Sequence, residues 1–243
     1  MEGTKLNRLI IIGASGHGKV VADIAKLCGY TEIIFLDNNP ELKECSGYPV
    51  LGPDTMTAEL EGEIFVAVGN SEIRQRLMER DAGRVFPILI HPSAVIAEDV
   101  TIGEGTVVMA GSVINPGARI GKECIVNTSS SIDHDCTVGD YCHVSVGSHL
   151  SGTVCLGNHV WVGTGATISN NVNICSDVMI GAGAVVINDV KESGTYVGVP
   201  IRKMDSKVEE ALNTKVSEPN RGGYCLSNTQ NTVFQSIKNW RAA

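Results

Sequence analysis

Two histidines in the middle of the chain are candidate functional residues, and one of them, His134, has neighbours suited to proton transfer. His134 stands between Asp133 and Asp135 in the run SIDHDC, and His143 follows in the run HVSVG. A carboxylate bonded to one imidazole nitrogen fixes the tautomer and makes the other nitrogen a stronger base. Such a pairing would strengthen His134 as a base, and the sequence does not decide which aspartate pairs with it. The competing interpretation is an ordinary solvated histidine.

A glycine-rich turn near the N-terminus has the composition of an anion site. The run RLIIIGASGHGKVV predicts a buried strand, then a turn with Ser15, Gly16 and His17, then a helix. Free backbone N–H groups at a helix start hold phosphate, whereas the alternative is a tight turn without a ligand. The spacing is GxxGxG, so it supports a dinucleotide site only weakly. Asp37, after the next strand, either holds a ribose hydroxyl or caps a loop.

A six-residue repeat must position the two histidines. A branched aliphatic residue recurs at every sixth position from Ile96 to Val186, and a small or β-branched residue usually follows four positions later. This period fits neither a helix nor simple strand alternation. Three units of strand and corner make an eighteen-residue triangular coil, and such coils stack as a parallel β-helix. His134 falls two positions after Ile132, at a corner, so its ring should point outward.

One column of residues eighteen apart is almost wholly apolar and is expected to face outward. An exposed apolar stripe indicates a partner surface, and a homotrimer around an axis along the solenoid would cover it. His143 would then lie near the junction between subunits. The column comprises Val107, Ile125, His143, Trp161 and Met179.

The patterns divide the chain into three parts. Residues 1–90 are expected to form a Rossmann-like α/β domain, with a third strand in IFVAVGN and a helix near Glu72–Arg80. Residues 91–204 carry the all-β hexapeptide repeat. Residues 205–243 are a tail to which the sequence assigns no role.

Composition narrows the possible partners and the compartment. The 243 residues carry a net charge of −8, which argues against nucleic acid or an anionic membrane as the main partner. No apolar stretch is long enough to span a membrane, and no secretory signal pattern is present. The eight cysteines form no CxxC pair, which favours a packing role and a cytoplasmic protein.

Six motifs together resemble the PglD/NeuD-type sugar acetyltransferases, over roughly residues 8–204. Within that family they are most similar to the bacterial UDP-4-amino-sugar N-acetyltransferases that make precursors of di-N-acetylbacillosamine. The resemblance implies the left hand of the β-helix. Asp135 departs from some relatives, which have Glu there, and the family pattern does not predict the tail. The motifs are GASGHGK, IFLDN, VGNSEIR, VNTSSSIDHDC, HVSVG and VGVPIRKM.

The resemblance also implies an activity and a role for particular residues. The expected reaction moves acetyl from acetyl-CoA directly to the 4-amino group of a nucleotide-linked sugar, with UDP expected as the nucleotide, at a trimer interface and without a metal. His134 would be the general base and Asp135 would raise its basicity. The expected acetyl-CoA residues are His143, Thr164 and Ala182. The expected nucleotide-sugar residues are Ser15, Gly16, His17, Asp37, Asn38, Gly69 and Asn127.

Three other functions compete with this expectation. A sugar O-acetyltransferase of the sialic-acid type would use the same histidine on a hydroxyl. A zinc hydratase of the γ-carbonic-anhydrase sort would need three converging histidines, and His143, His149 and His159 match that arrangement poorly. A non-catalytic scaffold would need none of these residues for turnover.

Overall fold

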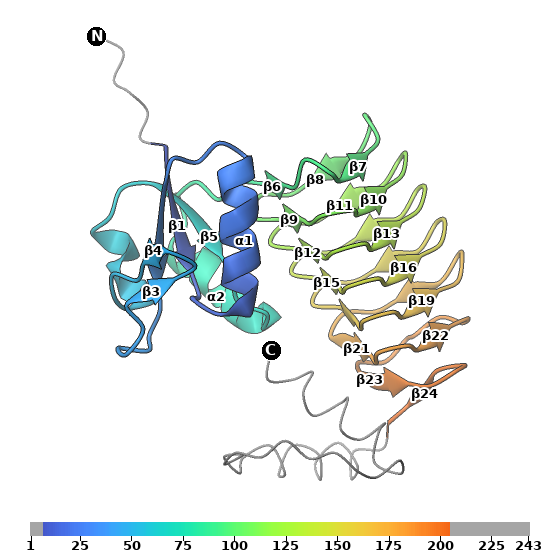
Figure 1. Cartoon of the computed structure of the whole chain (residues 1–243). Helices are drawn as coiled ribbons and strands as arrows, with labels where there is room; N and C mark the ends of the chain where they lie inside the picture. Colours follow the sequence, from blue (N-terminus) through green and yellow to red (C-terminus); the bar gives the residue numbers. More distant parts are fainter. Residues whose placement is uncertain (1–6, 205–243) are drawn as a thin grey trace, which may run out of the picture.

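The computed structural model describes residues 7–204, which form a small α/β domain beside a long solenoid (Figure 1). The solenoid is the left-handed parallel β-helix that the repeat and the resemblance predict, so the expected fold class is confirmed. The predicted tail, 205–243, lies outside the described residues.

The α/β domain is built on a three-stranded parallel sheet in the order β2-β1-β5. Its strands are β1 (Arg8–Ile12), β2 (Glu32–Leu36) and β5 (Glu63–Val66). Helices α1 (Gly16–Leu27) and α2 (Ser71–Arg80) cover opposite faces, because alternate residues of each buried strand point to opposite sides. The predicted strand–turn–helix–strand order and the helix near Glu72–Arg80 are present.

Smaller elements connect β2 to β5. They are β3 (Glu44–Cys45), β4 (Tyr48–Pro49), which pairs with β3, and the short 3-10 helix η1 (Asp54–Ala58). The repeat and strand patterns in the sequence did not predict them.

The solenoid has three faces, named here by their number of strands. The five-stranded face contains β8 (Thr101–Ile102), β11 (Arg119–Ile120), β14 (Thr137–Val138), β17 (Cys155–Leu156) and β20 (Asn173–Ile174). The six-stranded face contains β7 (Val95–Ile96), β10 (Val113–Ile114), β13 (Ser131–Ile132), β16 (His149–Leu150), β19 (Thr167–Ile168) and β22 (Val185–Val186). The eight-stranded face contains β6 (Leu89–Ile90), β9 (Val107–Val108), β12 (Ile125–Val126), β15 (His143–Val144), β18 (Trp161–Val162), β21 (Val178–Ile180), β23 (Gly194–Val197) and β24 (Arg202–Lys203).

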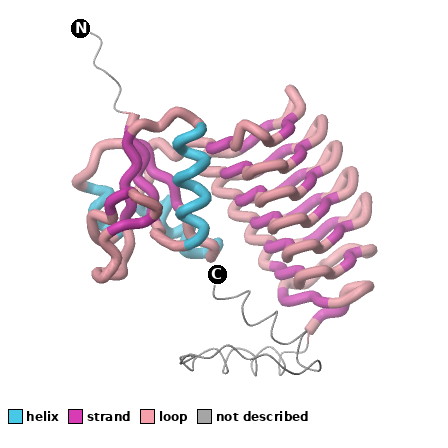
Figure 2. The backbone as a smooth tube through the Cα atoms, in the orientation of Figure 1, coloured by secondary structure: helices cyan, strands magenta, loops and turns pink. Residues whose placement is uncertain are grey.

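Register follows the eighteen-residue coil. Ile114 pairs with Ile132, and Ile132 with Leu150, so the repeated aliphatic residues stack inside the prism. Figure 2 shows these short strands stacked in coils and joined by loops. The strand β6, just before the boundary expected at residue 90, already pairs with β9 of the eight-stranded face.

The apolar column on the eight-stranded face is not an exposed stripe. Val107 and Ile125 are 0% and 2% exposed, and they share a hydrophobic cluster with the α1 side of the α/β domain. In Figure 1, α1 stands directly against this edge of the solenoid. The interpretation of the column as a surface for a second copy is therefore wrong at these levels. The apolar column identifies a face of the solenoid that is buried by packing, and the α/β domain of the same chain packs on it.

Among the described residues, no helix is both long and apolar enough to cross a membrane. Cys124, Cys136 and Cys142 are buried, unpaired and directed into the solenoid core, in agreement with their predicted packing role.

Candidate functional site

His134 lies at the corner between the six-stranded and five-stranded faces, just after β13. Its side chain is 57% exposed, and its Nδ1 lies 2.9 Å from Oδ2 of Asp135. Adjacent side chains on a straight strand would point apart, but Asp135 has φ of 57° and turns back toward the ring. This hydrogen bond, with the negative charges of both aspartates, raises the pKa of His134 above 6.5.

Asp133 holds the backbone of the same corner. Its Oδ1 accepts hydrogen bonds from the backbone N–H of His134 and from the side-chain amide of Asn115 on the preceding coil, both at 2.8 Å. The hydrogen bond from Asn115 is the main cause of the lowered pKa of Asp133. The two aspartates therefore have different tasks, and Asp135 is the one that contacts the imidazole.

Glycines on neighbouring coils make room for this pair. A Cβ added at Gly152 would lie 2.4 Å from Nε2 of His134, and one added at Gly117 would lie 2.5 Å from Oδ1 of Asp135. Real Cβ atoms do not approach so closely. The ring nitrogen that is free to act as a base therefore lies directly over Gly152.

A cavity of about 440 Å³ separates the start of α1 from the eight-stranded face. It brings together seven of the predicted site residues from distant parts of the chain. Five were predicted to bind the nucleotide-sugar and two the acetyl-CoA. They are Ser15, Gly16, His17, Gly69, Asn127, His143 and Thr164.

Two imidazoles in this cavity have unused nitrogens. Nε2 of His17 and Nδ1 of His143 are enclosed and have no hydrogen-bond partner among the described residues. The other ring nitrogen of His143 lies 3.1 Å from the amide nitrogen of Asn127, and its ring stacks on Trp161. Burial and the nearby Arg74 cation lower the pKa of His17 to about 4 and move that of His143 well below 6.5. Both rings are neutral at physiological pH and free to bond a ligand.

The buried neutral His17 should make the protein acid-sensitive. The pKa is 6.5 in the unfolded chain and about 4 in the folded one, so the unfolded chain binds more protons between these values and stability falls as pH drops through them. Between pH 7 and pH 5 this group should remove about 2 kcal/mol of stability. Urea unfolding at both pH values should show a smaller loss for His17→Gln. The exposed His149→Gln is the control, and an equal loss in all three proteins would contradict the expectation.

The other predicted site residues lie outside this cavity. Asp37 accepts backbone N–H groups of Ala14 and Asn39, so its carboxylate already braces the glycine-rich turn. Asn38 pairs with Asp54 through both its amide atoms. Ala182 is exposed one coil below Thr164, whose carbonyl accepts the N–H of Gly183. Thr164 and Ala182 thus lie at one corner of the solenoid.

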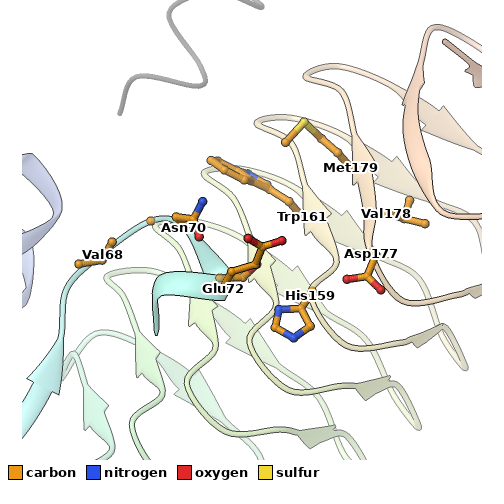
Figure 3. Close-up of a pocket in the computed structure, with 10 residues that line it drawn as sticks. Val68, Asn70, Glu72, His159, Trp161, Asp177, Val178 and Met179 are labelled. Carbon is orange, nitrogen blue, oxygen red and sulfur yellow. The ribbon is translucent and has the colours of Figure 1, made fainter. Parts of the chain in front are cut away.

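A second cavity, of about 660 Å³, continues on the other side of Trp161 (Figure 3). Gly69 and Asn70, at the start of α2, line one wall, and the carboxylate of Glu72 points into the space. His159, which stacks on Tyr141, and Asp177 form the solenoid side. The sequence patterns did not predict a site role for Glu72, Trp161 or Asp177, and they marked Trp161 only as an apolar member of its column.

His134 lines neither cavity. Its corner joins the five-stranded and six-stranded faces, and in a three-sided solenoid that corner is opposite the eight-stranded face, on which the α/β domain packs. Within one chain, the predicted base and the predicted nucleotide-sugar residues are therefore on opposite sides.

Over residues 7–204, no group of three or more His, Cys, Asp or Glu side chains is placed to bind one metal ion. His143, His149 and His159 in particular do not converge.

Known proteins resemble this chain in both of its parts. The family model of the PglD N-terminal domain matches residues 8–80. UDP-N-acetylbacillosamine N-acetyltransferase of Bacillus subtilis (strain 168) is 36% identical over 113 residues, which cover 43% of this chain and 52% of that protein. The alignment thus spans about half the length of that curated relative.

Solved structures match over a longer range. The acetyltransferase domain of PglB from Neisseria gonorrhoeae FA1090 is 39% identical with a TM-score of 0.78, covering 82% of this chain and 100% of that one. The same domain has been solved with acetyl coenzyme A. PerB from Caulobacter crescentus, solved with CoA and GDP-perosamine, is 37% identical with a TM-score of 0.76, covering 81% of this chain and 97% of that one.

Proposed function

This chain belongs to the PglD/NeuD-type sugar acetyltransferase family, and on that premise we propose that it acetylates a nucleotide-linked amino sugar with acetyl-CoA. The acceptor is the 4-amino group of an amino-deoxy sugar, and the nucleotide is UDP. The curated relative from Bacillus subtilis favours UDP, whereas the Caulobacter structure holds a GDP-sugar. One observation carries the proposal: within residues 7–204, an exposed His134–Asp135 pair lies outside both of the cavities described above.

The nucleotide-sugar is proposed to bind in the cavity between α1 and the solenoid. Ser15 at the start of α1 forms no side-chain cap, so the first N–H groups of the helix are available to phosphate oxygens. The neutral rings of His17 and His143 offer further polar atoms to the ligand. Asp37 acts here indirectly, because its carboxylate holds the turn that contains Ala14.

Acetyl-CoA is proposed to lie along the corner of the solenoid marked by Thr164 and Ala182, with its acetyl end toward His143. Thr164 lines the α1 cavity and Ala182 continues the same corner on the next coil. This arrangement would bring the thioester to the edge of the sugar site.

A second copy of the chain completes the proposed site. His134 is exposed and opposite the cavity of its own chain, so a neighbouring solenoid must present its cavity to this imidazole. Three copies around an axis along the solenoid would give each cavity one base. The proposal of a homotrimer is supported by the separation of His134 from the cavity within one chain. The apolar column does not support it.

The proposed chemistry is direct transfer. The neutral amine attacks the thioester carbonyl, the C–N bond forms, and Nε2 of His134 takes the proton from the amine nitrogen. The C–S bond then breaks, and the departing thiolate takes that proton from the His134 imidazolium, so the products are an acetamide and CoA and the base is restored. Asp135 stabilises the imidazolium that forms. No cysteine is needed as a nucleophile.

Replacement of Asp135 by asparagine should move the pH dependence of the reaction. Asp135 raises the pKa of His134 above 6.5, and only the neutral ring accepts a proton, so kcat/KM of the wild type should rise with pH through a value above 6.5. Asp135→Asn should shift this inflection to lower pH and reduce the plateau roughly tenfold. An inflection at the same pH in Asp135→Asn and wild type would show that Asp135 does not set the pKa of the catalytic base.

The proposed activity is tested by incubating the protein with acetyl-CoA and a panel of UDP-, GDP- and dTDP-linked 4-amino sugars, with free sialic acid as the hydroxyl acceptor. Release of CoA thiol and an acetamide product by mass spectrometry are expected with a UDP-amino sugar. Acetylation of sialic acid alone would favour the O-acetyltransferase alternative. If no acceptor is acetylated, the result would favour the alternative of a non-catalytic scaffold.

A further inference from the structure

Arg74, in the first half of α2, is a buried cation between the two parts of the molecule. Its side chain is only 1% exposed. Burial of an arginine is costly unless every donor finds an acceptor, so its partners indicate why the position needs this residue. The motif VGNSEIR contains it, but from the sequence alone Arg74 is predicted only as a residue of a helix.

The guanidinium of Arg74 bonds four backbone carbonyls. Two belong to the loop before α2: Nη1 donates to Val68 at 3.0 Å and to Gly69 at 2.8 Å. Two belong to successive corners of the solenoid: Nε donates to Glu123 at 3.0 Å and Nη2 to Tyr141 at 2.7 Å. Among the described residues, no backbone N–H donates to any of these four carbonyls. One planar group thus fixes the loop to the solenoid.

The loop that Arg74 holds is part of both cavities. Gly69 lines the α1 cavity and the cavity of Figure 3, and Val68 lines the latter. The same four bonds therefore set how far the loop stands from Trp161, the residue that separates the two spaces. A shift of the loop would change the width of both.

The guanidinium of Arg74 bonds four backbone carbonyls, and the nearby Glu123 also favours its charged form. The carboxyl group of Glu123 is buried, and its oxygens have no hydrogen-bond partner within residues 7–204. Burial raises its pKa well above the ordinary value. The Arg74 cation also contributes to the lowered pKa of His17 and His143, so it helps to keep both cavity rings neutral.

We propose that Arg74 is a positioning residue for the nucleotide-sugar: by tying the Val68–Gly69 loop to two solenoid corners, it sets the geometry of the acceptor cavity without touching the acetyl-CoA corner. This inference rests on the proposed function of the cavity. Under this proposal, a contact between the two parts of the chain controls binding of the acceptor. Loss of that contact should therefore change KM for the nucleotide-sugar and not KM for acetyl-CoA.

The test compares Arg74→Ala with Arg84→Ala. Arg84 also donates to three backbone carbonyls, those of Thr57, Leu60 and Gly62, but all lie in the α/β domain away from both cavities. Arg74→Ala should raise KM for the nucleotide-sugar at least about tenfold and leave KM for acetyl-CoA within about twofold, since misplacement of a binding group by about 1 Å has effects of this size. Arg84→Ala should lower the melting temperature but change neither KM.

Two further measurements separate positioning from general damage. Ethylguanidinium added to Arg74→Ala should lower the nucleotide-sugar KM toward the wild-type value, with no such effect on Arg84→Ala. Arg74→Lys, which keeps the charge but loses the planar fork, should fold and show an intermediate KM. Equal increases in both KM values, or the same increase in Arg84→Ala, would overturn the proposal. An unchanged nucleotide-sugar KM in folded Arg74→Lys and Arg74→Ala would also overturn it.

The rise in melting temperature caused by UDP or GDP alone tests the role of Arg74 independently of the proposed reaction. Wild type that transfers no acetyl group would refute the proposed function, yet a nucleotide-induced rise in melting temperature that Arg74→Ala loses and Arg84→Ala keeps would still support Arg74 as a positioning residue. A rise that is equal in all three proteins would count against it.

Discussion

Replacement of His134 by glutamine is expected to lower kcat by about 10²–10⁴-fold, the usual contribution of a positioned general base. The side chain is 57% exposed, and within residues 7–204 its only side-chain partner is Asp135, so its loss removes little packing. Melting temperature and oligomeric state should therefore match the wild type. Steady-state rates at saturating acetyl-CoA and nucleotide-sugar measure the effect.

His149→Gln is the matched control for this substitution. His149 is an exposed histidine on the next strand of the six-stranded face. Its Nδ1 lies 2.8 Å from the hydroxyl of Ser131, whereas Nδ1 of His134 bonds the carboxylate of Asp135. It should retain wild-type kcat. Comparable losses at both positions would indicate a surface effect and refute His134 as the base.

Substitution of Gly152 by alanine is expected to lower kcat by about 10²-fold. The added Cβ would lie 2.4 Å from Nε2 of His134, the nitrogen that is proposed to take the proton, so the ring must swing away. Because a misplaced base loses most of its effect, the rate should fall while the binding of both substrates persists. The substitution adds a single methyl group, and the exposed ring can move without disturbing the core.

A double-mutant cycle tests whether Gly152 acts through His134. If the methyl group only displaces the imidazole, Gly152→Ala should cost almost nothing further in a His134→Gln background. Additive losses would show that the methyl group harms the site in another way, for example by blocking the acceptor.

The repeat predicted the solenoid well because its cause is local and periodic. Inward aliphatic residues such as Ile114 and Ile132 recur with the coil, and their stacking follows directly from the eighteen-residue register. The outward direction of His134 followed from the same counting. Its pairing with Asp135 did not, because that contact depends on one left-handed corner residue, which the spacing does not reveal.

Contacts between the two parts of the chain were beyond the sequence patterns. An apolar column shows that a face is covered but not by what, and here the cover of Val107 and Ile125 is the chain's own domain. Arg74 resembles any solvated helix arginine in sequence, since its partners are main-chain carbonyls, which no residue type marks. Side chains that line the cavity of Figure 3, such as Glu72, meet only when α2 packs on the solenoid.

The central claim is that the base and the acceptor cavity of one site come from different copies of the chain, and mixing two inactive variants tests it most directly. His134→Gln lacks the base but keeps the cavity. Gly16→Asp keeps the base but puts a carboxylate at the proposed phosphate site, where a Cβ meets nothing within 4 Å, so the fold should tolerate it. The two are unfolded together, refolded at equal amounts and assayed.

In random trimers, a site is intact when a Gly16→Asp copy supplies the base to the cavity of a His134→Gln copy. The account predicts recovery of about one quarter of wild-type activity, the product of two probabilities of one half. Activity no greater than that of the separate variants would contradict the account, because it would place base and cavity in the same chain.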